Sequence, residues 1–335
     1  GEVFLATQLS LDRKVAVKVL PPAITRDPEL VNDFKHEMRA LAKLDHPNVA
    51  TAFAAGEHDG LHFMAMAFVD GEDLAERLLR EGPLQEGEAL HCTLKVAEAL
   101  KYGWDRFHLL HRDIKPGNIM IDREGVVKLM DMGLSKTLYE DLGGVLPSVI
   151  VGTPNYMSTE QARGEPGLSV LVDIYALGAT LYHLLTGILP FDAETPEAVL
   201  ETMLSEELQP ANEIRPELSA AAVRVIERMT ARDPAQRYPD WAAVIEDLKE
   251  ASPGEGEAAA RGPRRVRVDP GELIAKQERE HARRSRDRLR ARTIGAVITI
   301  LVLVGAGGVI AYLYRAGQQA DDARERAQTA ENEQH

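Results

Sequence analysis

The stretch HLLHRDIKPGNIMID, residues 108–122, places charged side chains among apolar ones. Asp113 could accept a proton from a hydroxyl group, Lys115 could neutralise a phosphoryl group during its transfer, and Asn118 could bind a metal ion. We expect the apolar neighbours to be buried and to fix these groups rigidly, as a reactive arrangement requires. These neighbours are Leu109, Leu110, Ile114, Ile119, Met120 and Ile121.

Three more charged residues fit the same chemistry. In KLMDMGL an apolar strand ends at Asp131, whose carboxylate suits Mg²⁺, and Gly133 gives the backbone room to turn. Lys18 ends the strand VAVK and would direct its charge towards phosphates, and Glu37 on the next helix is placed to form an ion pair with it. A cation, its acidic partner, a base and two metal ligands are the components of phosphoryl transfer.

The elements that position these residues change in type along the chain. KVAVKVLP alternates and is rich in valine, which predicts a strand, whereas residues 27–44 carry apolar residues at helical spacing. The prediction is strands at 14–21 and 60–69, helices at 27–44, 86–105, 172–187, 220–230 and 241–250, and a loop-rich region at 108–165. Strands followed by helices indicate an α+β protein with a small sheet lobe and a larger helical lobe.

The C-terminal part has a different composition. Residues 251–293 are first rich in Gly, Pro and charge and then basic, which predicts a juxtamembrane linker. Residues 294–313 contain no charge and are long enough to cross a hydrocarbon core of about 30 Å as a helix. The cations before this span predict that residues 1–292 lie in the cytoplasm and that 314–335 form a short extracytoplasmic tail.

Charge and cysteine content exclude some classes of function. Residues 1–260 hold 24 Lys and Arg against 43 Asp and Glu, whereas residues 261–292 hold 12 against 5. An acidic domain of this kind is not expected to bind nucleic acid. Cys92, the single cysteine, cannot form an internal disulfide and is expected to be a buried apolar residue. The opening GEVFLATQ has neither an initiator methionine nor a signal peptide, and we expect the chain to begin within a longer protein.

Seven motifs in order resemble those of the eukaryotic-type (Hanks-type) Ser/Thr protein kinases, and the chain is most similar to bacterial membrane-anchored receptor kinases. The motifs are VAVK, FKHEMRALAKLDHPNVA, HRDIKPGN, DMG, GTPNYMSTEQA, DIYALG and RDPAQRY. The resemblance covers residues 1–250 and implies the two-lobed protein kinase fold. Residues 1–69 would be a partial N-lobe and residues 70–250 the C-lobe.

The resemblance assigns the reacting groups. Asp113 would orient and deprotonate a Ser or Thr hydroxyl group of a protein substrate, and Lys115 would steady the γ-phosphate of ATP. Asn118 and Asp131 would bind Mg²⁺ or Mn²⁺.

It also implies a nucleotide pocket. The adenine would lie between Val3 and Ala16 on one side and Met120 on the other. Its edge would face the backbone of Ala67–Val69, with Phe68 in the middle of this stretch, and Met66 would be the gatekeeper. Lys18 and Glu37 would complete the nucleotide site.

Other motif residues have scaffold roles by the same resemblance. Glu160 and Arg237 would form a buried ion pair, Asp173 would bind the backbone of the loop around Asp113, and His111 would anchor that loop rather than act as a base. Thr153 would connect the loop to the peptide site.

The sequence departs from the family pattern at four places. Gly1-Glu2-Val3 is only the tail of the glycine-rich loop GxGxxGxV, so the chain as it stands is expected to bind ATP poorly. DMG replaces DFG, and Met132 is expected to fill the place of the phenylalanine. STE replaces APE but retains Glu160, and Ala67 replaces an acidic residue of the linker between the lobes.

Two alternative functions stay open: a kinase-like binding module without catalysis and a small-molecule kinase. The intact charged set disfavours the first, and the peptide-facing segment GTPNYMSTEQA disfavours the second. The partners expected for a protein kinase are ATP, protein substrates, the cell membrane and a second copy of the chain.

The position of Arg112 beside Asp113 predicts regulation. In the family this arginine meets a phosphate on the activation segment, and Ser148 is the predicted acceptor, with Thr137 as the second choice. The competing interpretation is that Arg112 pairs with Glu140 or Asp141.

Overall fold

The computed structural model describes residues 2–20, 41–58, 61–132 and 153–252, all of them within one compact unit, Gly1–Pro263. Several predictions fall outside the described residues. They are the start of helix 27–44 with Glu37, the segment with Thr137 and Ser148, most of the linker, and the span 294–313. Within the described ranges, no helix combines the length and the apolar character needed to cross a bilayer.

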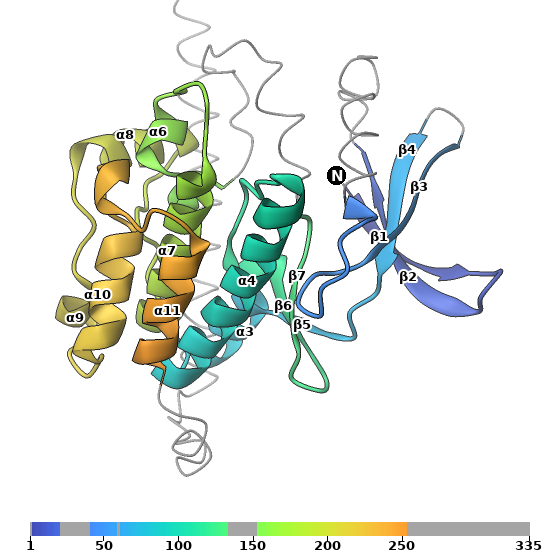
Figure 1. Cartoon of the computed structure of the whole chain (residues 1–335), viewed down its shortest axis with the longest axis horizontal. Coiled ribbons are helices and arrows are strands. Elements are labelled where there is room, and N and C mark those ends of the chain that lie inside the picture. Colours follow the sequence, from blue (N-terminus) through green and yellow to red (C-terminus); the bar gives the residue numbers. More distant parts are fainter. Residues whose placement is uncertain (1, 21–40, 59–60, 133–152, 253–335) are drawn as a thin grey trace, which may run out of the picture. The chain divides into compact units, whose positions relative to one another are not determined.

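The N-terminal part forms a four-stranded antiparallel sheet (Figure 1). Its strands are β1 (Glu2–Gln8), β2 (Arg13–Val19), β3 (Ala52–His58) and β4 (Leu61–Ala67), in the order β1-β2-β4-β3. The strands predicted at 14–21 and 60–69 are confirmed as β2 and β4. β3 was not predicted, because AFAAGEH shows little alternation of branched apolar residues.

The register of this sheet aligns most of the predicted nucleotide-binding residues on one face. Val3 is paired with Lys18 across β1 and β2, and Ala16 is paired with Met66 across β2 and β4. Residues directly opposite each other, and residues two apart on one strand, share a face of a sheet. All four side chains therefore belong to the same face.

A second, three-stranded sheet follows, with β5 (Gly71–Asp73), β6 (Ile119–Asp122) and β7 (Val127–Leu129) in that order. Leu129 N–H donates to the carbonyl of Asn48, and Ala50 N–H donates to the carbonyl of Leu129. These bonds join the chain before β3 to the edge of β7, so the two sheets are connected beside the site.

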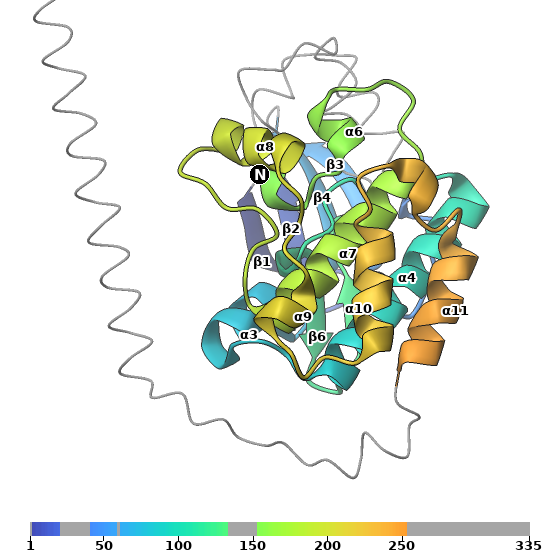
Figure 2. The ribbon, with the colours of Figure 1, turned by 90° about the vertical axis from the view of Figure 1, so that its left-hand side faces the viewer.

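The rest of the described chain is helical (Figure 2). The four helices predicted after residue 71 are confirmed as α4 (Glu86–Phe107), α7 (Val170–Thr186), α10 (Ala220–Met229) and α11 (Trp241–Ala251). Shorter helices are α3 (Leu74–Glu81), α6 (Thr159–Ala162), α8 (Pro196–Ser205) and α9 (Ala211–Ile214), with 3₁₀ turns η1 (Pro116–Asn118), η2 (Pro154–Tyr156) and η3 (Pro234–Gln236). α7 is buried along nearly its whole length, and α4, α10 and α11 pack around it.

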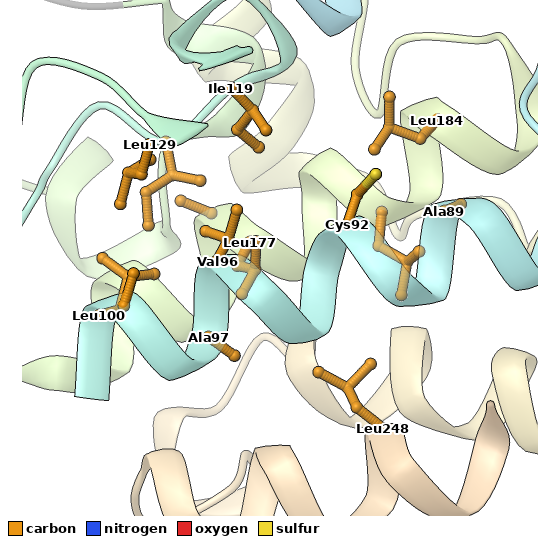
Figure 3. Close-up of a cluster of buried hydrophobic side chains, with 14 of the residues drawn as sticks. Ala89, Cys92, Val96, Ala97, Leu100, Ile119, Leu129, Leu177, Leu184 and Leu248 are labelled. Carbon is orange, nitrogen blue, oxygen red and sulfur yellow. The ribbon is translucent and has the colours of Figure 1, made fainter. Parts of the chain in front are cut away.

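The core lies between α4, α7, α11 and the second sheet (Figure 3). Val96 and Leu100 of α4 meet Leu129 of β7 and Leu177 of α7, and all four are at most 1% exposed. Cys92 is 2% exposed, as predicted, and burial raises the pKa of its thiol to about 12. At neutral pH it is therefore a protonated, unreactive apolar residue.

Candidate active site

The loop after α4 is fastened to α7 by a buried carboxylate. Asp173 is 1% exposed and accepts the N–H groups of His111 at 2.7 Å and of Arg112 at 2.8 Å. Burial raises the pKa of Asp173 overall, although these two N–H groups and the charge of Arg112 lower it in part. The predicted role of Asp173 as a ligand of the loop backbone is confirmed.

His111 uses both ring nitrogens on the backbone. Its Nδ1 accepts the N–H of Asp113 at 3.3 Å, so Nε2 carries the proton and donates to the carbonyl of Met130 at 2.9 Å. The ring is fully buried. It connects the loop to the strand that precedes Asp131 and has no nitrogen left for a substrate, which confirms the predicted anchor.

The carboxylate of Asp113 is surrounded by donors. Lys115 Nζ donates to its two oxygens at 3.1 and 2.8 Å and also to Thr153 Oγ1 at 3.0 Å. Asn118 Nδ2 donates to Asp113 Oδ2 at 3.0 Å and to the Asp113 carbonyl at 2.6 Å. The structure thus brings together the three predicted catalytic residues, and Thr153 connects them to the predicted peptide site.

The apolar neighbours of this loop divide into two groups. Ile114 and Ile119 are buried as predicted, at 1% exposure each. Leu109, Leu110, Met120 and Ile121 are only partly buried. The loop is therefore fixed at its centre by core packing and by hydrogen bonds elsewhere.

Among the residues that the structure describes, Lys18 forms its ion pair with Asp131 and not with a helix residue. Its Nζ lies 2.6 Å from Asp131 Oδ2, although the two residues are 113 positions apart. Glu37, its predicted partner, lies outside the described residues. The predicted phosphate-binding cation and the predicted metal ligand are thus in contact.

Two residues of the site have positive φ: Arg112 at 63° and Asp131 at 53°. Residues other than glycine seldom adopt this conformation, which costs about 1–3 kcal/mol and persists only where surrounding contacts enforce it. The bond from the Arg112 amide to Asp173 and the ion pair of Asp131 are such contacts. Strain of this kind clusters at functional sites.

The donor set fits a hard divalent cation. Both N–H bonds of the Asn118 amide are directed at Asp113, and among the described residues no hydrogen bond uses its Oδ1. The bond from Met130 N–H to the Asn118 carbonyl brings Asp131 close to it in the fold. The described residues contain no cluster of three or more His, Cys, Asp and Glu that could bind a metal. An amide oxygen and a carboxylate would therefore leave most Mg²⁺ positions to phosphate and water, as is usual for this ion.

Met132 packs in a notch of α4. Its side chain is 2% exposed, and a Cβ atom placed on Gly103 would lie 2.2 Å from Met132 Cε. The methionine that follows Asp131 is therefore buried, as predicted for a replacement of phenylalanine, and the glycine provides the space.

The predicted nucleotide-binding residues differ in exposure. Ala16 and Met66 are buried at 8% and 3%, whereas Val3 is 59% exposed, and Phe68 and Met120 are intermediate. A cavity of about 290 Å³ is lined by Ala67–Asp70, Val49–Thr51, Asp122, Glu124 and Lys128. It shares Ala67–Val69, the stretch predicted to face the edge of the adenine, with the predicted nucleotide site. It contains none of the residues around Asp113, so it does not mark the reacting centre.

The segment after residue 153 is fastened by a buried ion pair. Arg237 donates to the two carboxylate oxygens of Glu160 at 2.7 and 2.9 Å, and to the carbonyls of Ala231 and Leu171. Burial would raise the pKa of Glu160, but the hydrogen bonds and charge of Arg237 lower it overall. The predicted pair is confirmed.

Sequence reasoning missed the contact between Tyr156 and His183, which lies at 2.6 Å. No local signal could have found it, because the two residues are 27 positions apart on different elements. Thr137 and Ser148 cannot be placed, since they lie outside the described residues.

Comparison with known families agrees with this arrangement. Residues 1–247 match the model of the protein kinase domain. Among curated proteins, serine/threonine-protein kinase PrkC of Bacillus subtilis is 36% identical over 252 residues, which cover 75% of this chain. Serine/threonine-protein kinase PknB of Mycolicibacterium smegmatis is 34% identical over 270 residues, which cover 78%. The alignments span only 38% of PrkC and 42% of PknB.

Solved structures give the same result. The kinase domain of Mycobacterium tuberculosis PknI is 30% identical with a TM-score of 0.60, and the match covers 75% of this chain and 91% of that one. Rad53 1–466 in complex with AMP-PNP is 25% identical with a TM-score of 0.62, covering 75% of this chain and 61% of Rad53.

We expect Arg237→Met to lower the free energy of unfolding by about 3–5 kcal/mol, because Glu160 would be left as an uncompensated buried charge. The double variant Glu160→Gln/Arg237→Met removes both charges and should recover part of this loss. Chemical denaturation of the full chain measures both. Equal losses in the two variants would contradict the argument.

The pKa of Glu160 is lowered in the folded protein, so its ionised carboxylate should stabilise the fold at any pH above the ordinary glutamate pKa of 4.5. This stabilisation should be lost as the pH falls below 4.5, and chemical denaturation at a series of pH values measures it.

Proposed function

The chain belongs to the protein kinase domain family, and from this premise we propose that it is a Ser/Thr protein kinase that transfers the γ-phosphate of ATP to hydroxyl groups of proteins. The observation that carries the proposal is the position of Asp113, whose carboxylate accepts hydrogen bonds from Lys115 and Asn118. Lys115 also donates a hydrogen bond to Thr153 of the segment that we propose faces the substrate. The names of PrkC and PknB support Ser/Thr specificity, and the AMP-PNP complex of Rad53 supports an adenine nucleotide.

The proposal gives each residue a task. Asp113 accepts the proton of the attacking hydroxyl group at its carboxylate, which the surrounding donors keep in one orientation. Lys115 lies between this carboxylate and Thr153 and neutralises charge on the transferred group.

The remaining residues bind the nucleotide and metal. Lys18 would bind phosphate oxygens, and Asn118 and Asp131 would hold Mg²⁺. When bound, Mg²⁺ neutralises the charge that develops on the phosphates during transfer. Ala16, Met66 and Val3 share the sheet face that carries Lys18 and would line the adenine site together with Phe68 and Met120.

We also propose that the protein is anchored in the cell membrane by residues 294–313, with the kinase domain in the cytoplasm. The support is the uncharged span and the cations before it. The alignment with a probable serine/threonine-protein kinase of Corynebacterium efficiens, which covers 93% of this chain, extends beyond the kinase domain.

Asp113→Asn should lower phosphate transfer to a mixed protein substrate by at least about a hundredfold, because the hydroxyl group loses its proton acceptor. Nucleotide binding should be retained, since the residues proposed to bind phosphate and metal are unchanged. Transfer from ATP labelled in the γ position, measured with full-length protein, checks this. The matched control is Asp105→Asn, which removes only a surface carboxylate paired with Lys101. A wild type that binds ATP but transfers no phosphate would instead support a kinase-like binding module.

Deletion of residues 294–313 should move the protein from the membrane fraction to the soluble fraction after lysis. In sealed cells, external protease should leave the kinase domain of the intact chain uncut. Digestion of the kinase domain under these conditions would refute the proposed orientation.

We expect autophosphorylation in trans at Ser148, or at Thr137, because a phosphate on this segment could reach Arg112 and order the segment. Association of membrane helices would raise the local concentration of kinase domains and favour the reaction. Mass spectrometry should find the phosphate in wild type and not in Asp113→Asn. Undiminished activity in Thr137→Ala/Ser148→Ala would contradict the regulatory role.

A further inference from the structure

Gly103 lies near the C-terminal end of helix α4, which ends at Phe107, and it is buried. Glycine is less favourable than alanine inside a helix, because it loses more backbone freedom on folding and has no side chain that could pack. A glycine at such a position therefore indicates that another group needs the space that a side chain would fill.

The side chain of Met132 occupies this space. A Cβ atom on Gly103 would overlap Met132 Cε and would lie 3.4 Å from Met132 Sδ. Met132 is 2% exposed and belongs to the main core, where close packing leaves its sulfur and methyl group little room elsewhere. The size of the residue at position 103 and the position of Met132 are therefore linked.

Met132 follows Asp131 and supports it from one side. On the other side, Met130 N–H donates to the Asn118 carbonyl, and the Met130 carbonyl accepts from His111 Nε2. No backbone–backbone hydrogen bond between described residues uses Met132. Its position therefore depends on side-chain packing, whereas Met130 is fixed by hydrogen bonds.

Asp131 needs support on both sides because its backbone is strained. Its φ is 53°, a conformation that an aspartate keeps only where its surroundings enforce it. In this conformation its carboxylate lies 2.6 Å from Lys18 Nζ. If Met132 left the notch at Gly103, Asp131 could relax to an ordinary conformation, and its carboxylate would turn away from Lys18.

We infer that Gly103 is a positioning residue for the proposed metal ligand: by leaving room for Met132, it keeps Asp131 in the orientation that would bind the cation. This inference rests on the proposed kinase function. Gly103 touches none of the reacting groups, so a larger residue there should weaken metal binding without weakening the binding of metal-free nucleotide.

The test measures the affinity of the full chain for AMP-PNP by calorimetry, once with Mn²⁺ and once with EDTA. Gly103→Val adds three carbon atoms on a side chain that is stiff at χ1 and cannot easily turn away. The affinity for the Mn²⁺ complex should fall at least about tenfold, the loss typical when a metal ligand loses the group that orients it. The affinity for metal-free AMP-PNP should not fall, because Lys18 and the sheet face around it are unchanged.

Variants at both positions separate this role from a general loss of packing. Met132→Ala removes three heavy atoms and leaves the notch empty, so it should also weaken binding of the Mn²⁺ complex. Gly103→Val/Met132→Ala moves the same number of atoms to the other side of the contact, and its affinity for the Mn²⁺ complex should return to within about threefold of wild type. Gly103→Ala is the mild control, because rotation of the flexible end of Met132 can accommodate one carbon atom.

Thermal unfolding shows whether each variant is folded. If Gly103→Val is not, the comparison of Met132→Ala with the double variant carries the test, and a double variant that binds the Mn²⁺ complex no better than Met132→Ala would contradict the inference. Equal losses with and without Mn²⁺ in a folded Gly103→Val, or no loss at all, would overturn it.

These measurements do not require phosphate transfer. A wild type that binds AMP-PNP equally well with and without Mn²⁺ would refute the inference together with the metal assignment of Asp131. A wild type that prefers the Mn²⁺ complex but transfers no phosphate would count against the proposed function, and the exchange of size between positions 103 and 132 would still decide the role of Gly103.

Discussion

The carboxylate of Asp173 accepts two backbone N–H groups of the loop that carries Asp113, and the geometry of the site follows from this contact. The buried carboxylate needs hydrogen-bond donors, and the loop needs a fixed attachment point, so the contact stabilises both the carboxylate and the loop. The attachment point lies on α7, which is buried along nearly its whole length. The hydrogen bond from the Arg112 N–H to Asp173 helps to keep Arg112 at its positive φ, and Asp113 is the next residue in the chain.

Groups from distant parts of the sequence meet where the two sheets join. Lys18 comes from β2, and Asp131 follows β7 two residues after its end. Asn48 reinforces the junction, because its side chain donates to the Val127 carbonyl and its own carbonyl accepts from Leu129. This pair places the proposed phosphate-binding cation next to the proposed metal ligand.

The segment 153–162, which we propose faces the substrate, is held by two buried pairs of different character. Glu160 and Arg237 are charged, and their separation would leave an uncompensated charge in the interior. Tyr156 and His183 are neutral, so their contact fixes position at a smaller desolvation cost. Together the pairs hold Tyr156 and Glu160 of this segment against the helical core.

The sequence by itself determined the four long helices and the loop around Asp113, because helical periodicity and motif spacing are local properties. The scaffold roles of Asp173 and Glu160 followed from the resemblance of its motifs to a known family. The sequence also predicted the strand before Asp131, which is β7, but it did not determine β3, β5 or β6. β5 and β6 have only three and four residues and carry too little pattern to detect. Only the tertiary structure decided that Lys18 meets Asp131 and that Tyr156 meets His183. Those contacts depend on how separate elements pack together, and no spacing along a chain specifies the distance between side chains on different elements.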